Sequence, residues 1–492
     1  MHYHLIGIAG TAMGSLAGLL RAKGHRVTGS DAAVYPPMST QLEEQGIEYA
    51  TQFSPANLDP VPDMVIVGNA ISRGNEELEA VLERRIPYTS AAAVIKEELL
   101  RGKHVVAVAG THGKTTTTSI VAWLLECGGL NPSFLIGGIA ENFGASFRLT
   151  DSEYFCIEAD EYDTAYFDKG PKMWHYLPWT AVVNNIEFDH ADIYRDETAY
   201  RFAFERFINL VPRTGRLIVG WDTPIARELS KKSHAPVDSV DIEEASGVGR
   251  PASERPARSD AGSSMPDAPS WQARDIHYGE AGSHFDVHHG GRRLGTVETP
   301  ITGAFNVRNC LAAIAAATAV GVPWPTIAEG LRTFQSVKRR MEVKGVVRGV
   351  TVIDDFAHHP TAVRETVQAV RQRFGERRVV AIFEPRSYTA QRREFQEPYR
   401  EALRVADRVV LAGLFHPERY DAATGMNPEE LTQSLRADGV QADYIPDVDR
   451  IVEAIAPEAG DGDVLLVMSN GGFGGIHQKL LDALASEPEP AR

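Results

Sequence analysis

Hydrophobic and polar positions along the chain alternate between two kinds of segment. Short runs of mainly apolar residues, typical of strands buried on both faces of a parallel sheet, occur at Tyr3–Ile8, Val105–Ala109 and Val350–Ile353. A polar or glycine-containing turn follows each run, and a segment with helical periodicity follows the turn, as at Ser15–Lys23. This alternation predicts α/β units built on parallel sheets.

The pattern restarts twice, and a length of 492 residues fits about three domains. We expect a Rossmann-like N-terminal unit over residues 1–102, a central domain over 103–335 and a Rossmann-like C-terminal domain over 336–492. The central domain should combine a parallel sheet with a small β-ribbon, because alternation on both sides of Gly290-Gly291 predicts a hairpin. From about 231 to 274 the apolar periodicity is lost, and we expect a mobile surface insertion without catalytic work.

The composition narrows the class of protein. Hydrophobic residues make up 43% and charged residues 24%, as in ordinary globular proteins. The net charge of −16 argues against a general nucleic-acid or anionic-membrane surface. The three cysteines lie far apart, and the sequence shows neither a signal peptide nor an apolar stretch of about 18 residues. We therefore expect a cytoplasmic protein with no obligatory protein partner.

The stretch HVVAVAGTHGKTTTTSI predicts a strand, a phosphate-binding loop and a helix. The loop and the first helical turn comprise Gly110, Thr111, His112, Gly113, Lys114, Thr115 and Thr116. The glycines let backbone N–H groups surround a polyphosphate, Lys114 would reach the β- and γ-phosphates, and the Thr115 hydroxyl would hold Mg²⁺. Only two residues separate the glycines, against the usual four, but the GKT core in this setting still predicts a P-loop-type ATPase domain.

Two further strands of the central domain are followed by acidic residues and a histidine. Glu158 follows the run Tyr154–Ile157, and His190 comes shortly after Ala181–Asn184. Because parallel strands share one carboxyl edge, Thr115, Glu158 and His190 can converge there. A carboxylate beside a GKT loop is the arrangement that holds nucleotide Mg²⁺. His190 could bind the metal or a phosphate, or it could be an ordinary core or surface histidine.

The first turn of the N-terminal unit contains Gly7, Gly10 and Gly14, and Asp31 comes at the end of the second strand. This pattern favours binding of a nucleotide diphosphate at the helix N-terminus, with the Asp31 carboxylate directed toward a ribose. The G-x-x-G-x-x-x-G spacing differs from the dinucleotide fingerprint, so NAD is only weakly indicated.

An Ala-rich helix near residue 311 carries Asn306 and Asn309, three positions apart on one face. Paired amides at this spacing could contact a nucleotide base. Capping and packing would explain them equally well.

Polar clusters follow three strands of the C-terminal domain. They are Asp354–Pro360, Glu384–Ser387 and Ser469–Gly475. Some of these residues could be helix caps, since Pro360 begins a helical pattern. Three clusters at the ends of strands in one sheet nevertheless favour a ligand-binding edge.

Together these motifs resemble the Mur ligase family over essentially the whole chain. The resemblance rests on GTHGKTTT, EADEYD, NNIEFDHAD, the Asn306/Asn309 helix, RRME at 339–342 and DDFAHHPT, in that order. It implies an ATP-dependent carbon–nitrogen ligase of peptidoglycan metabolism that uses two Mg²⁺ ions and passes through an acyl phosphate. Within the family, GNAISRGN, EYDTAYFDK and MSNGGFGGIHQKLL resemble the branch that joins UDP-N-acetylmuramate to L-alanyl-γ-D-glutamyl-meso-diaminopimelate in peptidoglycan recycling. The branch that adds L-alanine in de novo synthesis is the alternative.

The matched motifs imply roles for individual residues. ATP binding is implied for Gly110, Thr111, His112, Gly113, Lys114, Thr115, Thr116, Asn306, Asn309, Arg340 and Asp355. Catalytic roles are implied for Lys114, Glu158, His190 and His358, with Mg²⁺ held by Thr115, Glu158 and His190. UDP-sugar binding is implied for Gly10, Thr11, Ala12, Met13, Ser30, Asp31, Asn69 and Asn142. Peptide binding is implied for His359, Arg386, Ser469 and Asn470, and the Arg386 fork would suit a peptide carboxylate.

One position departs from the family pattern. Several members carry a carbamylated lysine that bridges magnesium, whereas this sequence has no lysine between Lys172 and Lys231. The expected position is Phe204. We therefore expect a magnesium site without a carbamate.

Two readings lie outside the ligases. An NAD-dependent dehydrogenase is one alternative, but the first glycine turn lacks the G-x-G-x-x-G spacing that is typical of NAD binding. A non-enzymatic nucleotide-binding switch or scaffold would need Lys114 and Thr115 but not the polar edge of the C-terminal domain. Since ATP contacts are implied from two domains, we also expect domain closure about linkers near residues 102 and 336.

Overall fold

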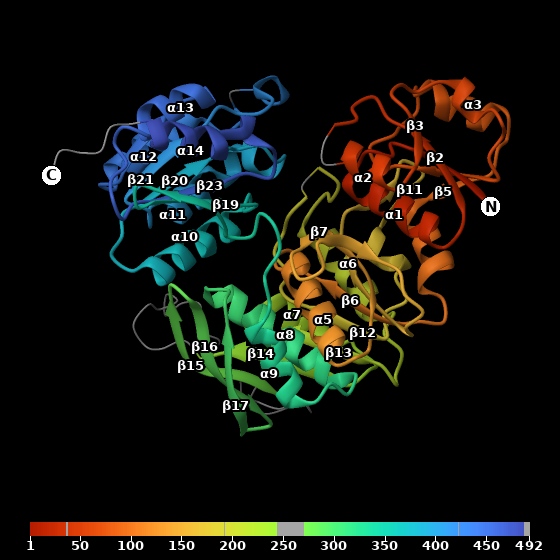
Figure 1. Cartoon of the computed structure of the whole chain (residues 1–492), viewed down its shortest axis with the longest axis horizontal. Coiled ribbons are helices and arrows are strands. Elements are labelled where there is room, and N and C mark those ends of the chain that lie inside the picture. Colours follow the sequence, from red (N-terminus) through yellow and green to blue (C-terminus); the bar gives the residue numbers. More distant parts are fainter. Residues whose placement is uncertain (36–37, 191, 244–269, 422, 487–492) are drawn as a thin grey trace.

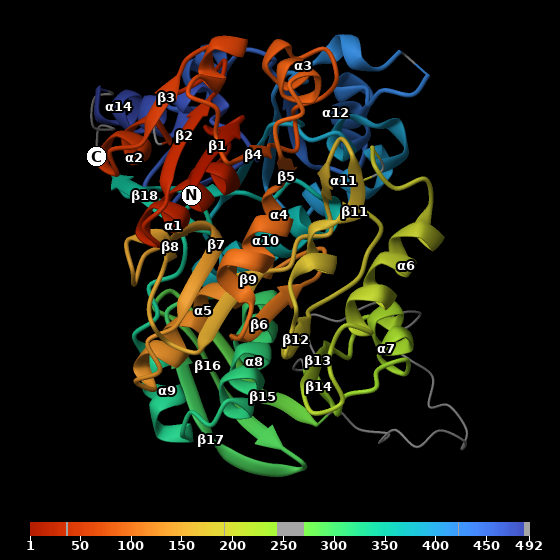
Figure 2. The same ribbon diagram turned by 90° about the vertical axis from the view of Figure 1, so that its right-hand side faces the viewer.

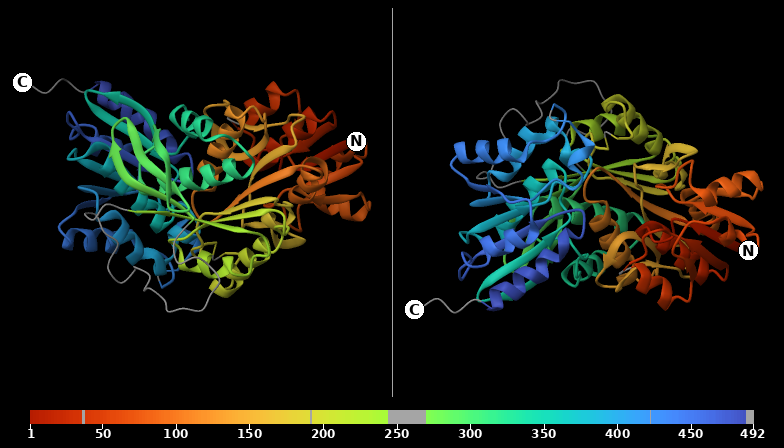
Figure 3. Two further views of the ribbon diagram at one scale, coloured as in Figure 1. Left: turned by 90° about the horizontal axis from the view of Figure 1, so that it is seen from below. Right: turned by 90° about the horizontal axis from the view of Figure 1, so that it is seen from above.

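The computed structural model describes residues 1–35, 38–190, 192–243, 270–421 and 423–486. The chain forms three α/β domains, as the sequence predicts. In Figure 1 the C-terminal domain lies at the upper left and the N-terminal domain at the upper right, with the central domain below them, and Figure 3 shows the central domain between the other two. No helix in these ranges is both long enough and apolar enough to span a bilayer.

The N-terminal domain is a parallel sheet of five strands in the order β3-β2-β1-β4-β5. Its elements are β1 (His2–Ile6), α1 (Thr11–Ala22), β2 (Arg26–Ser30), α2 (Met38–Glu44), β3 (Glu48–Ala50), β4 (Met64–Val67), α3 (Glu76–Glu83), β5 (Tyr88–Ser90) and α4 (Ala91–Val94). The strand order reverses between β1 and β4, which is where such sheets bind ligands. The predicted glycine turn therefore lies at this switch point.

Glu98 links α1 to the last turn of the N-terminal domain. Its carboxylate accepts hydrogen bonds from Tyr3 Oη at 2.9 Å and from Lys23 Nζ at 2.5 Å. Burial alone would raise the pKa of Glu98, but these donors lower it from 4.5 to about 2. The stabilisation from this carboxylate is complete above pH 4.5 and is lost as the pH falls toward 2.

Glu98→Gln should therefore lower the free energy of unfolding at pH 7 by about 1–2 kcal/mol. The variant should also lose less stability than the wild type between pH 5 and pH 2.5. Denaturant unfolding across this range measures both effects. The matched control is Glu97→Gln, which removes an exposed carboxylate paired with Arg101 and should change stability little. Equal acid sensitivity of Glu98→Gln and wild type would contradict the assignment.

The central domain is built on a ten-stranded sheet in the order β17-β16-β15-β14-β13-β12-β6-β9-β7-β8. Its strands are β6 (His104–Ala109), β7 (Ser133–Ala140), β8 (Ala145–Arg148), β9 (Tyr154–Glu158), β12 (Thr180–Val183), β13 (Arg216–Gly220), β14 (Val237–Ile242), β15 (Trp271–Gly279), β16 (Gly282–His289) and β17 (Arg292–Thr299). The helices are α5 (Lys114–Cys127), α6 (Glu197–Ile208), α7 (Pro224–Ser230), α8 (Ala304–Ala319) and α9 (Trp324–Arg332). A separate antiparallel pair is formed by β10 (Asp163–Ala165) and β11 (Asp168–Pro171).

The prediction of a loop over 231–274 is wrong at both ends. Residues 237–242 form β14, which pairs in parallel with β13, and Trp271 begins β15. Val240 and Trp271 are buried, so the two ends of the predicted loop are fixed by contacts in the core. The apolar periodicity of these segments is too weak to predict such contacts. Residues 244–269 of the predicted insertion lie outside the described ranges. The predicted ribbon is also larger than expected, since β15, β16 and β17 extend the main sheet.

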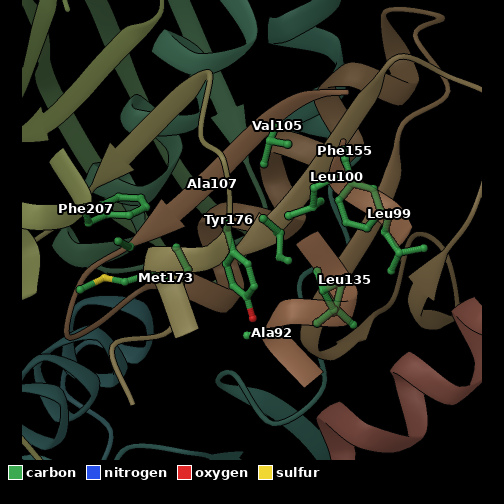
Figure 4. Close-up of a cluster of buried hydrophobic side chains, with 14 of the residues drawn as sticks. Ala92, Leu99, Leu100, Val105, Ala107, Leu135, Phe155, Met173, Tyr176 and Phe207 are labelled. Carbon is green, nitrogen blue, oxygen red and sulfur yellow. The ribbon is translucent and has the colours of Figure 1, made fainter. Parts of the chain in front are cut away.

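Both faces of the central sheet are covered. Figure 2 shows α5, α8 and α9 on one side of the strands and α6 and α7 on the other. A cluster of buried side chains also joins the sheet to the last turn of the N-terminal domain, where Leu99 and Leu100 pack near Val105 and Phe155 (Figure 4). The N-terminal and central domains therefore share one continuous core.

The C-terminal domain has six strands in the order β18-β19-β23-β20-β21-β22. Its strands are β18 (Glu342–Val347), β19 (Val350–Asp355), β20 (Val379–Phe383), β21 (Arg408–Leu411), β22 (Gln441–Tyr444) and β23 (Val464–Met468). Its helices are α10 (Pro360–Phe374), α11 (Gln396–Leu403), α12 (Pro428–Ala437), α13 (Val448–Ile455) and α14 (Ile476–Ser486). Because β19, β23 and β20 are neighbours, the three predicted polar clusters do meet at one edge.

Candidate active site

A cavity of about 270 Å³ lies between the central and C-terminal domains, where the carboxyl ends of both sheets face each other. The predicted site residues among its lining are Thr111, His112, Gly113, Lys114, Thr115, Thr116, Glu158, His190, Asn306, Asn309, Arg340, Asp355 and His358. The structure thus brings together residues from two domains that the sequence could place only at separate strand ends.

The phosphate loop is shaped by its glycines. Gly110 has φ +137° and Gly113 has φ +82°, a backbone region that residues with a Cβ rarely adopt. A Cβ on Gly113 would also lie 2.4 Å from Asn309 Oδ1. The loop leads directly into α5, so its N–H groups and the helix N-terminus face the cavity.

Lys114 is held in place by a buried carboxylate. Its Nζ donates to Glu161 Oε1 at 3.0 Å and Oε2 at 2.8 Å, and to the Gly110 carbonyl at 2.7 Å. Glu161 is fully buried. Burial alone would lower the pKa of Lys114, but the neighbouring carboxylates raise it, so the ammonium group keeps its charge.

The predicted magnesium ligands Thr115 and Glu158 lie side by side. Thr115 Oγ1 accepts a hydrogen bond from Arg340 Nη2 at 3.0 Å, and Glu158 Oε1 accepts one from Gly137 N at 2.7 Å. Burial raises the pKa of Glu158, and this rise is opposed by Gly137 N–H and the charge of Lys114. A hydroxyl and a carboxylate are the oxygen ligands that Mg²⁺ prefers, so this pair fits the ion.

His190 lies at the same edge in an unusual backbone conformation, with φ +54°. Its Nε2 is 3.3 Å from Glu161 Oε1 and 3.9 Å from Asp189 Oδ2. Burial alone would lower the pKa of His190, but these carboxylates raise it to about 9. The imidazole therefore carries a proton in this arrangement and would have to lose it to bind a metal.

Asn306 and Asn309 are buried and joined, since Asn309 Nδ2 donates to Asn306 Oδ1 at 3.3 Å. Asn306 also donates to the Thr302 carbonyl at 2.9 Å, and Asn309 accepts from Thr117 Oγ1 at 3.1 Å. Packing and hydrogen bonding thus account for both amides. Contact with a base stays a prediction.

Asp355 connects the linker to the C-terminal domain. Its carboxylate accepts hydrogen bonds from the N–H groups of Met341 and Ala357, both at 2.8 Å, and burial raises its pKa. His358 lies in the same wall, where its Nδ1 is 3.0 Å from the Phe356 carbonyl, and burial lowers its pKa. A neutral His358 can accept or donate a proton at the cavity surface.

The predicted UDP-sugar residues lie in the N-terminal domain and at its edges. Gly10, Thr11 and Ala12 are exposed at the start of α1, whereas Met13 is buried. Asp31 accepts a hydrogen bond from Ala9 N at 3.0 Å and so braces the turn.

The other residues of this predicted group make structural contacts. Ser30 is fully buried, and its carbonyl accepts from Gly7 N at 2.8 Å. Asn69 Nδ2 donates to Asp163 Oδ1 at 2.8 Å, across the boundary with the central domain. Asn142 donates to the Thr333 carbonyl at 2.9 Å and accepts from Gln335 N at 2.7 Å.

The predicted peptide residues lie at the polar edge of the C-terminal sheet. Arg386 stacks on Phe415, with Cζ 3.4 Å from the ring centroid, and its Nη1 is 3.8 Å from Glu384 Oε1. Ser469 Oγ donates to Glu384, and Asn470 Oδ1 is buried without a hydrogen-bond partner among the described residues. His359 is the N-cap of α10.

Sequence reasoning missed two residues of this region. Glu161 belongs to the same EADEYD motif as Glu158, but the motif alone does not say which acid faces Lys114. Asp189 is also buried and accepts a hydrogen bond from Thr389 Oγ1 at 2.7 Å, which ties the central domain to the C-terminal domain. No local sequence pattern predicts a contact between two residues that are 200 positions apart.

Phe204, the position where a bridging lysine was considered, is fully buried on α6. Its ring lies against Tyr200, with 5.2 Å between centroids. The side chain is part of the core and presents no ligand atom, and a magnesium site without a carbamate stays a prediction.

Family models match three consecutive parts of the chain: "Mur ligase family, catalytic domain" over residues 2–103, "Mur ligase middle domain" over 108–317 and "Mur ligase, glutamate ligase domain" over 339–471. The UDP-N-acetylmuramate–L-alanyl-gamma-D-glutamyl-meso-2,6-diaminoheptandioate ligase of Escherichia coli K12 is 42% identical over 493 residues, covering 100% of both chains. The UDP-N-acetylmuramate–L-alanine ligase of Roseiflexus sp. RS-1 is 36% identical over 498 residues, covering 99% of this chain and 100% of that one. The crystal structure of a murein peptide ligase from Psychrobacter arcticus 273-4 covers 100% of both chains with a TM-score of 0.72 and 36% identity.

Proposed function

The chain belongs to the Mur ligase family, and on this premise we propose that it joins UDP-N-acetylmuramate to L-alanyl-γ-D-glutamyl-meso-diaminopimelate in an ATP-dependent reaction of peptidoglycan recycling. The observation that carries the proposal is the 42% identity, over the full length of both chains, to a ligase named for these two substrates. Membership of a ligase family sets aside the dehydrogenase and the non-enzymatic switch.

The chemistry needs two steps. A carboxylate oxygen of the muramic acid lactyl group attacks the γ-phosphorus of ATP, so ADP leaves and an acyl phosphate forms. The free amine of the peptide then attacks the acyl carbon, and inorganic phosphate leaves as the amide bond forms. Both steps depend on close positioning and on neutralising phosphate charge.

The cavity offers the groups that the first step requires. The N–H groups of the phosphate loop and the ammonium of Lys114 would bind the β- and γ-phosphates. Arg340, already hydrogen-bonded to Thr115, would add positive charge from the other domain. His358 lies in the facing wall, where it would approach the transferring phosphate.

Magnesium would be held in two places. Thr115 and Glu158 supply a hydroxyl and a carboxylate for one ion, and His190 would bind the second after losing its proton. The ions would supply charge neutralisation for the polyphosphate. Thr115, Glu158 and His190 all line the same cavity, which supports this assignment.

The outer domains would supply the two substrate sites. The exposed turn at Gly10–Ala12 lies at the switch point of the N-terminal sheet and would take the UDP diphosphate. Arg386 and Asn470, whose Oδ1 has no hydrogen-bond partner in the part of the chain that the structure describes, lie at the polar edge of the C-terminal sheet and would bind the peptide. With the predicted boundaries near residues 102 and 336, each outer domain would bind one substrate.

The alternative acceptor is L-alanine, because a ligase named for that substrate is also similar over the full length. Phosphate release from ATP and Mg²⁺ with UDP-N-acetylmuramate should be rapid with the tripeptide and near background with L-alanine. The matched control is the same pair of acceptors without UDP-N-acetylmuramate, which should give no release. Turnover with L-alanine alone would replace the proposed acceptor.

A further inference from the structure

Beside the cavity, three metal-binding side chains meet at the junction of the central and C-terminal domains. They are His112 of the phosphate loop, Glu187 from the loop after β12, and His359 at the start of α10. One ring nitrogen of each histidine and one carboxylate oxygen of Glu187 lie within 4.8 Å of one another. Of the three residues, His112 belongs to the described cavity lining and the other two do not.

Two imidazole nitrogens at this point lack hydrogen bonds. Nε2 of His112 and Nε2 of His359 are both buried with no hydrogen-bond partner among the described residues. His359 is 94% buried as a residue, at 6% exposure. Nε2 of His112 has the 3.5 Å ion-pair contact with Glu187 Oε2, whereas the unpartnered Nε2 of His359 carries a desolvation cost that a bound cation would relieve.

The spacing suits a tetrahedral ion. Ligand atoms about 2.1 Å from a tetrahedral Zn²⁺ lie about 3.4 Å apart. Nε2 of His112 is already 3.5 Å from Glu187 Oε2, so this pair needs almost no movement. The third residue, His359, has a ligand atom within 4.8 Å of the other two, and its Nδ1 receives a long contact of 3.4 Å from Thr361 N–H.

The surroundings favour a cation and allow it to enter. The Glu187 side chain is 34% exposed, which opens the cluster to solvent. The carboxylate of Asp189 adds negative potential at both histidines, and the carboxylate of Glu365, which lies near Arg308, adds negative potential at His112. The backbone N–H of His112 donates to Asn185 Oδ1 at 2.8 Å, so one ligand is already fixed in position.

We propose that His112, Glu187 and His359 form a binding site for a divalent transition-metal ion of the Zn²⁺ type, which bridges the central and C-terminal domains. Two imidazoles and one carboxylate with a fourth position for water are a typical Zn²⁺ ligand set, whereas Mg²⁺ prefers oxygen ligands. An ion bound here fixes His112, two positions before Lys114, to α10. Occupancy therefore holds the two domains together and restrains the phosphate loop.

Zinc titration of the whole protein by calorimetry, in excess Mg²⁺ and without nucleotide, tests this site directly. Excess Mg²⁺ fills the oxygen-rich positions at Thr115 and Glu158. Wild-type protein should bind one Zn²⁺, and Glu187→Gln and His359→Gln should each weaken that binding at least tenfold. The matched control is Glu141→Gln, which removes a partly exposed carboxylate of the central domain paired with Lys338 and lying outside the cluster, and it should retain wild-type affinity within about threefold. The two variants alter different domains, so a folding defect in one leaves the other informative.

A second readout follows from the bridge between domains. Zn²⁺ should raise the unfolding temperature of the wild type, because a ligand that binds only the folded state stabilises it, and it should not do so for Glu187→Gln. Absence of Zn²⁺ binding to wild type, or equal binding to wild type and both cluster variants, would overturn the proposal. Neither measurement uses turnover, so the result is independent of which peptide the enzyme accepts.

Discussion

Replacing Lys114 with methionine should reduce ATP-dependent turnover at least 10²–10³-fold, because the cavity then loses its fixed positive charge at the phosphate loop. Methionine is an unbranched, uncharged side chain that ends where the ammonium group of lysine begins, so the change mainly removes the charge. The variant should still bind UDP-N-acetylmuramate, whose predicted site lies in the N-terminal domain. Steady-state phosphate release, with the peptide and UDP-sugar saturating, measures the effect.

Stability must be separated from catalysis in this experiment. The change removes the ammonium group that contacts both oxygens of the fully buried Glu161 and leaves His190, 3.3 Å away, as a cationic neighbour, so the free energy of unfolding should fall by no more than about 3–5 kcal/mol. The double variant Lys114→Met/Glu161→Gln also removes the carboxylate charge that has lost its lysine partner, and it should recover most of the stability without recovering activity. A stable double variant with wild-type turnover would exclude a catalytic role for Lys114.

Glu158→Gln should lower kcat by about 10²-fold and raise the Mg²⁺ concentration required for half-maximal rate. The amide keeps the size of the side chain but replaces a charged metal ligand with a neutral one. Its backbone donor, Gly137 N–H, can still bond to the amide oxygen, so the local geometry should persist. Phosphate release measured over a range of Mg²⁺ concentrations checks both effects.

The matched control for this change is Glu141→Gln, which removes a partly exposed carboxylate of the same domain paired at 3.9 Å with Lys338. It should leave both kcat and the Mg²⁺ requirement near wild type. If Glu158→Gln shows the wild-type Mg²⁺ requirement, the metal assignment fails even where the rate is reduced.

Much of the fold follows from local patterns. Buried strands such as β6, β19 and β23 are short apolar runs, and each ends at a glycine or polar residue, so their position could be read along the chain. The errors occur where burial depends on distant partners. β14 and β15 pair with each other although residues 244–269 separate them in the sequence. The composition of the two strands does not predict this pairing.

The candidate site divides in the same way. The sequence by itself determined the phosphate loop, the acids at strand ends and the polar edge of the C-terminal domain, because residue type and spacing fix turns and parallel strands share their carboxyl edge. Only the tertiary structure decided which groups touch: Lys114 with Glu161, Arg340 with Thr115, and His112 near Glu187 and His359. These contacts join segments far apart in the chain, and their geometry is set by how the domains pack, which no local pattern encodes.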